Sequence, residues 1–227
     1  MNSSLISIII PTINEIENLP DLLINIKQSK QADKIEIVVV DGGSTDGTIQ
    51  YGQKFADLMI TAQLGRAIQL NAGAEVAQGK NLWFLHADSI LDFNIFSQYI
   101  DAISSSAWGR FDVQINNPNF VYLIISSLIN FRSRFSKIAT GDQGIFITKE
   151  LFYKVGKFPH LDLMEDIALS AKLKKYSSPF CSKLKIKTSA RKWQKEGVIK
   201  TILLMWRLRL LYFFGVNTKT LARLYYK

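Results

Sequence analysis

The sequence predicts an α/β fold in which helices flank a mainly parallel sheet. Three short apolar runs, Leu5–Ile10, Ile35–Val40 and Leu82–Leu85, are rich in β-branched or aromatic residues, which is typical of strands buried on both faces of a parallel sheet. Segments with helical periodicity lie between them, beginning with Asn18–Lys30, in which apolar side chains recur every three or four residues. This alternation favours right-handed βαβ units and therefore a mainly parallel sheet.

The later elements follow from the same two periodicities. We expect helices at Thr48–Phe55, Arg66–Gln78, Asp92–Ser106 and Met164–Lys175, and strands at Leu58–Thr61, Arg110–Ile115 and Ile145–Thr148. The segment Phe120–Phe135 is predicted to be a helix or an irregular lid. Around Leu184 and Ile186 the sequence alternates with lysines, which predicts an edge strand protected by charge.

Length and composition predict one globular domain in a reducing compartment. The chain has 227 residues, of which 48% are hydrophobic and 21% charged. Within that domain we expect a first part of about residues 1–90, a second of about 91–195 and C-terminal helices over 196–227. Cys181 is the single cysteine, so neither a disulfide framework nor a thiolate metal cluster is expected. No basic segment precedes the first apolar run, which is interpreted as a strand rather than a signal peptide; a cytoplasmic location is expected.

The net charge of +9 is concentrated in the last third of the chain. Residues 149–227 contain 18 Lys and Arg against 5 Asp and Glu, whereas residues 1–148 contain 10 against 14. Such a basic region suits nucleic acid, anionic lipid or an anionic substrate. Because the sequence offers neither a recognition helix nor a base-stacking platform, we do not expect nucleic acid as a partner.

Residues 198–214 are strongly apolar but too interrupted to span a membrane. Lys200, Arg207 and Arg209 break the segment, and a spanning helix needs about 20 apolar residues. On a helix, Lys200 and Arg207 share a narrow face while Arg209 lies nearly opposite them. Two interpretations remain open: a helix packed on the domain, or an interfacial helix lying on the inner face of a plasma membrane.

Polar clusters end three of the predicted buried strands. Asn14 and Glu15 follow the first, Asp41 ends the second, and His86-Ala-Asp88 follows the fourth. In a parallel sheet these ends meet along one edge, where ligands bind. Acids gathered there repel one another unless a cation or a donor-rich ligand joins them. Mg²⁺ or Mn²⁺ with a diphosphate would satisfy the cluster, although Asp41-Gly-Gly alone could also be a tight turn.

Three motifs together resemble family 2 glycosyltransferases, whose fold is called GT-A. They are Ile-Ile-Ile-Pro-Thr-Ile-Asn-Glu ending at Glu15, Val-Val-Val-Asp-Gly-Gly-Ser-Thr-Asp-Gly-Thr ending at Thr48, and Leu-His-Ala-Asp ending at Asp88. The resemblance is strong over about residues 5–90 and weaker to about 195. It implies a GT-A-like sheet that binds a nucleoside-diphosphate sugar, most simply of the UDP type.

The resemblance also implies roles for single residues. Asp88 is implied as the main metal ligand, because His86 stands where the family's Asp-x-Asp motif has its first acid. Two roles stay open for His86: a contact with the sugar or the ribose, or a structural role. Asp41 is implied to contact the base, Glu15 to lie near the nucleoside, and Arg66, which opens Arg-Ala-x-x-x-Asn-x-Gly, to lie near the nucleotide. The donor-binding set implied in this way is Pro11, Asn14, Glu15, Asp41, Gly43, Ser44, Arg66 and His86.

On the acceptor side the resemblance selects acids and one basic–aromatic pair. Glu165-Asp166 matches the pair whose second acid is the catalytic base in inverting members, although two acids at a helix start also fit the helix dipole alone. Arg191-x-Trp193 resembles the end of a Gln-x-x-Arg-Trp motif without its Gln, and is placed with Asp142 and Glu165 near the diphosphate or the acceptor.

The sequence as a whole predicts an inverting, metal-dependent glycosyltransferase. We expect Mg²⁺ or Mn²⁺ as cofactor, a hexosyl unit as the transferred group, and a glycan or lipid-linked acceptor such as a cell-envelope precursor, with peripheral membrane contact. Two alternatives are a non-catalytic membrane-surface or scaffold protein, and a sugar-phosphate nucleotidyltransferase. The second is disfavoured because Pro11-Thr-Ile-Asn-Glu replaces the Gly-rich phosphate loop that it needs.

Overall fold

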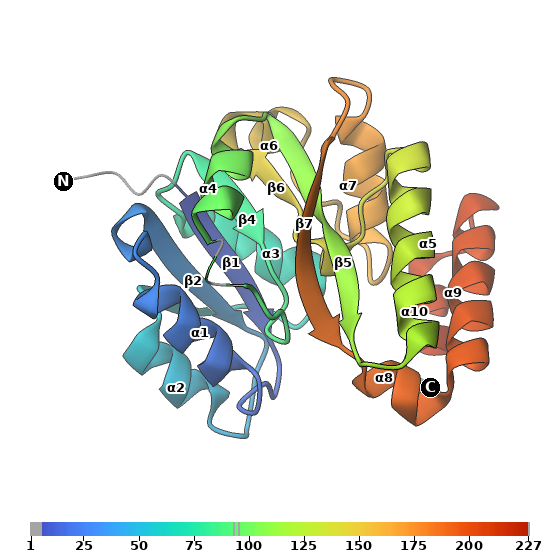
Figure 1. The fold of residues 1–227 in the computed structure, drawn as a ribbon, viewed down its shortest axis with the longest axis horizontal. Coiled ribbons are helices and arrows are strands. Elements are labelled where there is room, and N and C mark those ends of the chain that lie inside the picture. Colours follow the sequence, from blue (N-terminus) through green and yellow to red (C-terminus); the bar gives the residue numbers. More distant parts are fainter. Residues whose placement is uncertain (1–5, 93, 95, 227) are drawn as a thin grey trace.

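The computed structural model describes residues 6–92, 94 and 96–226, and Leu5 of the first predicted strand lies outside them. Its centre is a seven-stranded sheet in the order β3-β2-β1-β4-β6-β5-β7 (Figure 1). Neighbouring strands run parallel except around β6, which is antiparallel to both β4 and β5. The strands are β1 (Ile6–Thr12), β2 (Ile35–Asp41), β3 (Leu58–Thr61), β4 (Asn81–Phe84), β5 (Trp108–Asn116), β6 (Phe146–Thr148) and β7 (Phe180–Ser189).

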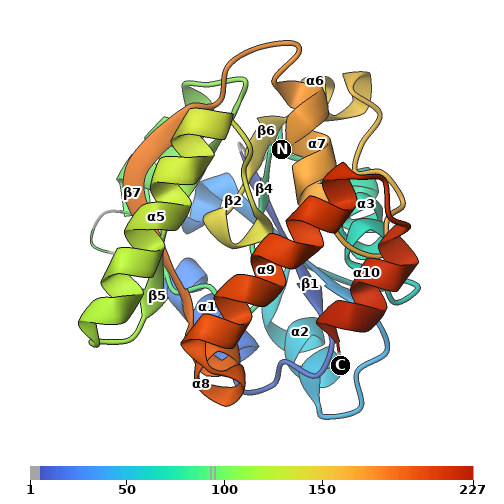
Figure 2. The same ribbon diagram turned by 90° about the vertical axis from the view of Figure 1, so that its right-hand side faces the viewer.

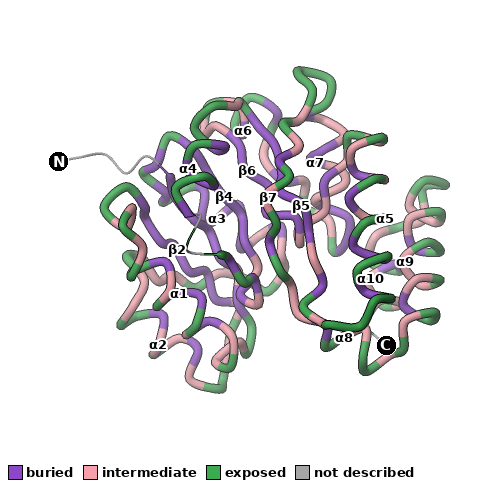
Figure 3. Tube along the Cα trace, viewed as in Figure 1, coloured by how far each residue is buried: buried purple, intermediate pink, exposed green. Residues whose placement is uncertain are grey.

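Two layers of helices cover the two faces of this sheet. On one face lie α1 (Leu19–Gln28), α2 (Thr48–Phe55) and α4 (Phe96–Ser104), and on the other α3 (Arg66–Val76), α6 (Lys149–Lys154) and α7 (Glu165–Leu173). Alternate residues of one strand serve different layers: Ile8 packs in the first and Ile9 in the second. The predicted buried strands are thus confirmed as the middle layer, which is enclosed on both sides (Figure 3).

Four further helices gather beyond the β5–β7 side of the sheet (Figure 2). They are α5 (Phe120–Ser136), α8 (Arg191–Glu196), α9 (Val198–Phe213) and α10 (Thr218–Tyr225). Apolar side chains of α5, α8 and α9 meet the end of β5 in one cluster. A second cluster joins α9 and α10 to Leu163 and Met164, which immediately precede α7. The C-terminal helices therefore pack on the loop that carries the predicted catalytic pair.

Most predicted elements are present, with differences at their ends. The first strand continues through Pro11 and Thr12, which were expected in a loop. α4 begins at Phe96 rather than Asp92, and α3 ends at Val76 rather than Gln78. α5 is one continuous helix, so the lid alternative is wrong for this segment. β7 is the edge strand that the lysine alternation predicts.

α9 combines features of both interpretations of residues 198–214. Its inner face buries Thr201 and Leu208 against the domain. Its outer face exposes a stripe at helical spacing, in which Trp206 is 74% and Phe213 82% exposed; the stripe consists of Ile199, Leu203, Trp206, Leu210 and Phe213. Across the described part of the chain, every helix is too short or too polar to cross a bilayer.

Candidate functional site

The loops that follow β1 and β2 are joined by hydrogen bonds at the carboxyl edge of the sheet. The backbone N–H of Asn14 donates to Ser44 Oγ at 2.8 Å, and Asn14 Oδ1 accepts from the backbone N–H of Thr45 at 2.9 Å. The backbone N–H of Glu15 donates to Thr48 Oγ1 at 2.9 Å. Since β1, β2 and β4 are parallel neighbours, the polar ends of these strands do meet, as the sequence predicts.

Asp41 is fully buried and its carboxylate is saturated by its own loop. Oδ1 accepts the backbone N–H groups of Gly43 and Ser44, each at 2.7 Å. Oδ2 accepts the hydroxyl of Thr12 at 2.9 Å and the hydroxyl of Ser44. The side chain therefore fixes the Gly-Gly-Ser turn, and a base would gain a contact with Asp41 only by displacing the Ser44 hydroxyl.

Asp88 and Arg191 share a groove of about 350 Å³ between α1, the segment after β4 and the start of α8. Glu15 lies at this groove's side, where its Oε2 accepts the Asn18 amide at 2.6 Å and pairs with Arg191 Nη2 at 3.6 Å. The volume is within the range of small-ligand sites. The loop after β1, the segment after β4 and the segment after β7 thus converge on one polar groove.

The acids of this groove suit a cation. Burial raises the pKa of Glu15, Asp88 adds to the rise, and Arg191 opposes it. Two carboxyl groups thus compete for one region, which a divalent ion would stabilise. No trio of His, Cys, Asp or Glu that could enclose a metal occurs within the residues described. One or two carboxylates plus ligand phosphates is the usual way in which Mg²⁺ is held, so the donor set fits a metal that arrives with a diphosphate.

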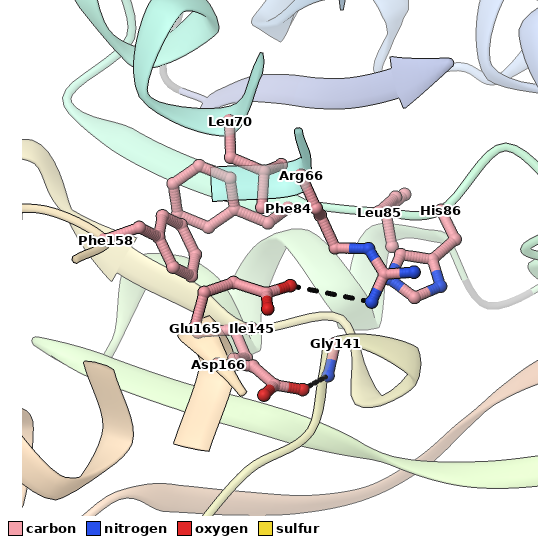
Figure 4. Close-up of a pocket in the computed structure, with 10 residues that line it drawn as sticks. All are labelled: Arg66, Leu70, Phe84, Leu85, His86, Gly141, Ile145, Phe158, Glu165 and Asp166. Atoms are coloured by element: carbon pink, nitrogen blue, oxygen red, sulfur yellow. Dashed lines mark hydrogen bonds and ion pairs between the residues drawn. The ribbon is translucent and has the colours of Figure 1, made fainter. Parts of the chain in front are cut away.

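A second, nearly closed pocket lies between α3, the residue after β4, and the start of α7 (Figure 4). Arg66 Nη1 pairs with Glu165 Oε1 at 3.5 Å. Asp166 Oδ2 accepts the backbone N–H of Gly141 at 2.8 Å, and its Oδ1 accepts that of Ile167 at 2.7 Å. The free space is about 10 Å³, enough for about one water molecule.

The ionisable groups of this pocket are perturbed in opposite directions. Burial raises the pKa of Glu165 to about 7, with Asp166 adding to the rise and Arg66 opposing it. Burial and the Arg66 charge lower the pKa of His86 to about 4, so its imidazole is neutral near pH 7. A Cβ on Gly141 would lie 2.7 Å from His86 Nε2, so glycine is what allows this close approach.

The C-terminal helix α10 lies close to Arg66 of this pocket. Burial raises the pKa of Tyr225, and the charge of Arg66 opposes this shift, which places the phenol near the guanidinium. Lys192 Nζ lies 3.1 Å from the centroid of the Tyr225 ring, a cation–π contact that ties α10 to α8. The pocket and the groove meet at the segment after β4, where His86 lines the pocket and Ala87 and Asp88 line the groove.

Comparison with known proteins shows the family of the chain. The model of glycosyl transferase family 2 matches residues 7–156, which include the ends of β1, β2 and β4 and the residues after β4 that line the pocket and the groove. The chain belongs to glycosyl transferase family 2. Within the family it is 38% identical over 98 residues to a PGL/p-HBAD biosynthesis glycosyltransferase of Mycobacterium bovis, covering 40% of this chain and 38% of that one.

Other relatives of this family 2 member are equally partial. An uncharacterized glycosyltransferase of Mycobacterium tuberculosis is 30% identical over 114 residues, which covers 46% of this chain and 44% of the relative. The curated relatives are therefore matched over less than half of their length. The assignment to the family favours glycosyl transfer over nucleotidyl transfer.

Solved structures share the fold. A mannosyltransferase from Pyrobaculum calidifontis, crystallised with GDP-Man and Mn²⁺, superposes with a TM-score of 0.65 at 21% identity over 90% of this chain and 60% of that one. Staphylococcus aureus TarS residues 1–349 with UDP-GlcNAc gives 0.60 at 20% identity over 81% and 58%. These likenesses establish the GT-A fold of the family 2 domain described here.

Several motif residues of this family 2 chain have structural contacts that the sequence did not predict. Pro11 is part of β1, opposite Val40, and Trp193 packs in the apolar cluster of α5 and α9 rather than lining either pocket. Gln69 Nε2 donates to the carbonyls of Thr12 and Val40 at 2.9 Å each, which holds the ends of β1 and β2 together. Its burial on the sheet-facing side of the predicted helix is the one feature that could have indicated this role.

Proposed function

We propose that this protein transfers a sugar, with inversion, from a nucleoside-diphosphate sugar of the UDP type to an acceptor hydroxyl, and that Asp166 is the base. The observation that carries the proposal is the placement of Asp166. Two backbone N–H groups hold its two oxygens in place, while each oxygen keeps a free acceptor position for a hydroxyl. General-base catalysis by such a group contributes about 10²–10⁴-fold.

Glu165 has a different role in this proposal. Neighbouring residues on a helix point about 100° apart, so the two acids cannot both face the reacting sugar. Glu165 is buried and paired with Arg66, which orients the arginine beside the neutral His86. We assign Arg66 and His86 to the sugar and the nucleotide, and Glu165 to positioning Arg66.

The groove is the proposed place of the donor's diphosphate and metal. Asp88, helped by Glu15, would hold Mg²⁺ or Mn²⁺, and Arg191 would contact the diphosphate. The ion supplies Lewis-acid stabilisation of charge on the leaving diphosphate. The presence of Mn²⁺ in the mannosyltransferase of similar fold, and in a glucosyl-3-phosphoglycerate synthase from Mycobacterium tuberculosis crystallised with UDP, supports this proposal.

The exposed apolar stripes support peripheral attachment to a membrane, with a glycan or lipid-linked acceptor of the cell envelope. The stripe on α9 has a counterpart on the neighbouring α5 (Figure 2), where Phe131 is 71% and Phe135 85% exposed. Exposed cations such as Lys200, Arg207 and Lys137 accompany the stripes. Each such charge contributes about 1 kcal/mol near an anionic surface. The protein would thus act on the cytoplasmic face of a plasma membrane.

The donor site is tested by replacing one carboxylate of the groove at a time. We expect Asp88→Ala to abolish the gain in UDP affinity that Mn²⁺ provides and to leave metal-free UDP binding nearly unchanged. Asp21→Ala, in the same groove, is the matched control and should keep both affinities. Calorimetry with UDP, with and without Mn²⁺, is the measurement. If Mn²⁺ still raises the UDP affinity of Asp88→Ala, the metal assignment is refuted. A separate assay, hydrolysis of a panel of nucleotide sugars, would show whether the protein is catalytic.

A further inference from the structure

Two of the three guanidinium nitrogens of Arg132, on α5, are buried and lack hydrogen-bond partners. Its Nε and Nη2 atoms are inaccessible to solvent, and neither has a hydrogen-bond acceptor. Among the residues that the structure describes, Arg132 also forms no ion pair. A buried donor without a partner costs about 1–3 kcal/mol, and more when it is charged, so such an atom calls for an explanation.

Asp142 has a buried acceptor atom without a hydrogen-bond donor. Its Oδ1 is buried and receives no hydrogen bond, although Asp142 is one of the acids whose charge acts on Arg132. The two side chains are too far apart for an ion pair in the described structure. Unpartnered, buried atoms of a cation and of a carboxylate therefore lie within electrostatic range of each other and of Asp166.

A second cation, Arg209, lies near Arg132. Arg209 of α9 lies close enough to Arg132 to repel it: burial lowers the pKa of Arg132 to about 10, Arg209 contributes to the fall, and Asp142 and Asp166 oppose it. Arg110 also repels Arg132; its Nη1 and Nη2 atoms donate to Asp112, the Phe111 carbonyl and the Asn130 carbonyl, and only its Nε lacks a partner. The short 3-10 helix Gly141–Gln143, which contains Asp142, lies between α5 and α9 (Figure 2).

We propose that Arg132 and Arg209 bind a phosphate group of the acceptor and that Asp142 receives a hydroxyl of the same molecule. Two arginines that approach from different helices match the charge of about −2 and the several oxygens of a phosphate monoester, whereas a carboxylate would neutralise only one of them. The acceptor is then a hydroxylated phosphate ester whose reacting hydroxyl lies near Asp166.

The donor's diphosphate does not explain these arginines. The groove of Asp88 and Arg191 lies between α1 and α8, and neither Arg132 nor Arg209 lines it. The inference rests on the proposed function insofar as it calls the ligand an acceptor. The phosphate site itself is testable by binding alone, without turnover, so its failure and that of the proposed function can be told apart.

The test measures binding of inorganic phosphate to the full chain saturated with UDP and Mg²⁺, by calorimetry. We expect Arg132→Met and Arg209→Met each to weaken phosphate binding by about tenfold or more while UDP affinity stays within about twofold. Arg132→Lys keeps the charge without the planar fork and should bind phosphate at an intermediate affinity. Arg207→Met, exposed on the same helix as Arg209, is the control and should bind as the wild type does.

A second arm separates two sources of the phosphate. Vesicles of phosphatidylcholine with phosphatidic acid replace inorganic phosphate. Vesicle binding that falls in Arg132→Met assigns the group to a lipid headgroup; vesicle binding that is unchanged, while inorganic phosphate binding is lost, assigns it to a soluble ester. Three results would each overturn the proposal. They are an unchanged phosphate affinity in both methionine variants, phosphate binding that UDP abolishes, and a tenfold loss of UDP affinity in either variant.

Discussion

Replacing Glu165 by Gln should change stability in a manner that depends on pH. The folded pKa of Glu165 is about 7, against 4.5 for an unperturbed carboxyl. Below about pH 4.5 the carboxyl is protonated in both the folded and the unfolded chain. Between the two pKa values only the folded chain retains the proton, so the stability due to protonation falls as the pH rises and is lost above about pH 7. The difference of 2.5 pKa units corresponds to about 3 kcal/mol.

Gln does not titrate and occupies nearly the same volume, so Glu165→Gln should escape this loss. Its free energy of unfolding, relative to the wild type, should rise by about 3 kcal/mol between pH 4.5 and pH 8, which for a chain of this size is about 6–12 °C in Tm. Urea denaturation across that pH range measures the difference. His86 shifts stability in the opposite direction, because its folded pKa is about 4, but it is present in both proteins and cancels. If the difference in unfolding free energy between the variant and the wild type does not vary with pH, Glu165 does not have the raised pKa of a buried carboxyl.

Two further predictions concern catalysis and attachment. Asp166→Asn should lower kcat by about 10²-fold or more. It should also reduce stability by about 1–3 kcal/mol, because the amide nitrogen of Asn cannot accept one of the two backbone N–H groups that Asp166 now binds. The control Asp162→Asn, at an exposed position on the preceding loop, should change neither kcat nor Tm. The double substitution Trp206→Ser and Phe213→Ser should abolish flotation with anionic vesicles at an unchanged Tm, since both side chains are largely exposed; a wild-type protein that remains in solution at low salt would contradict membrane attachment.

The strand ends could be predicted because local pattern and global fold agree there. Runs such as Ile35–Val40 have a composition that few environments other than a doubly covered parallel strand accept, and a parallel sheet necessarily brings the residues after such strands together. The same argument predicts that Asp88 and Glu15 lie in one region, as they do. The strand β6 was predicted, but its antiparallel direction was not. The short helices α6 and α8 were not predicted, because six residues carry too little periodicity to be distinguished from a loop.

Side-chain partners could not be predicted in the same way. Asp41 looked available for a ligand because sequence cannot show that three donors of its own loop and the hydroxyl of Thr12 on β1 already bind its carboxylate. Trp193 is a similar case, because the cluster against which it packs includes side chains of α5, which is far from it in sequence. The unpaired guanidinium of Arg132 is the opposite case: only three-dimensional packing shows that its expected acceptor is absent.

The position of Asp166 on the inner side of α9 determines how far the reaction takes place from the proposed membrane surface. Leu208 and Tyr212 lie on the side of α9 opposite its exposed stripe, and the charge of Asp166 acts on the Tyr212 hydroxyl. A helix with its side chains is about 10 Å across, so on the proposed membrane contact the base lies about that far above the lipid surface. Arg209 lies on the flank of α9, between these two levels. An acceptor that extends from the bilayer would therefore meet Arg209 before Asp166, so its charged group must precede its reacting hydroxyl along the molecule.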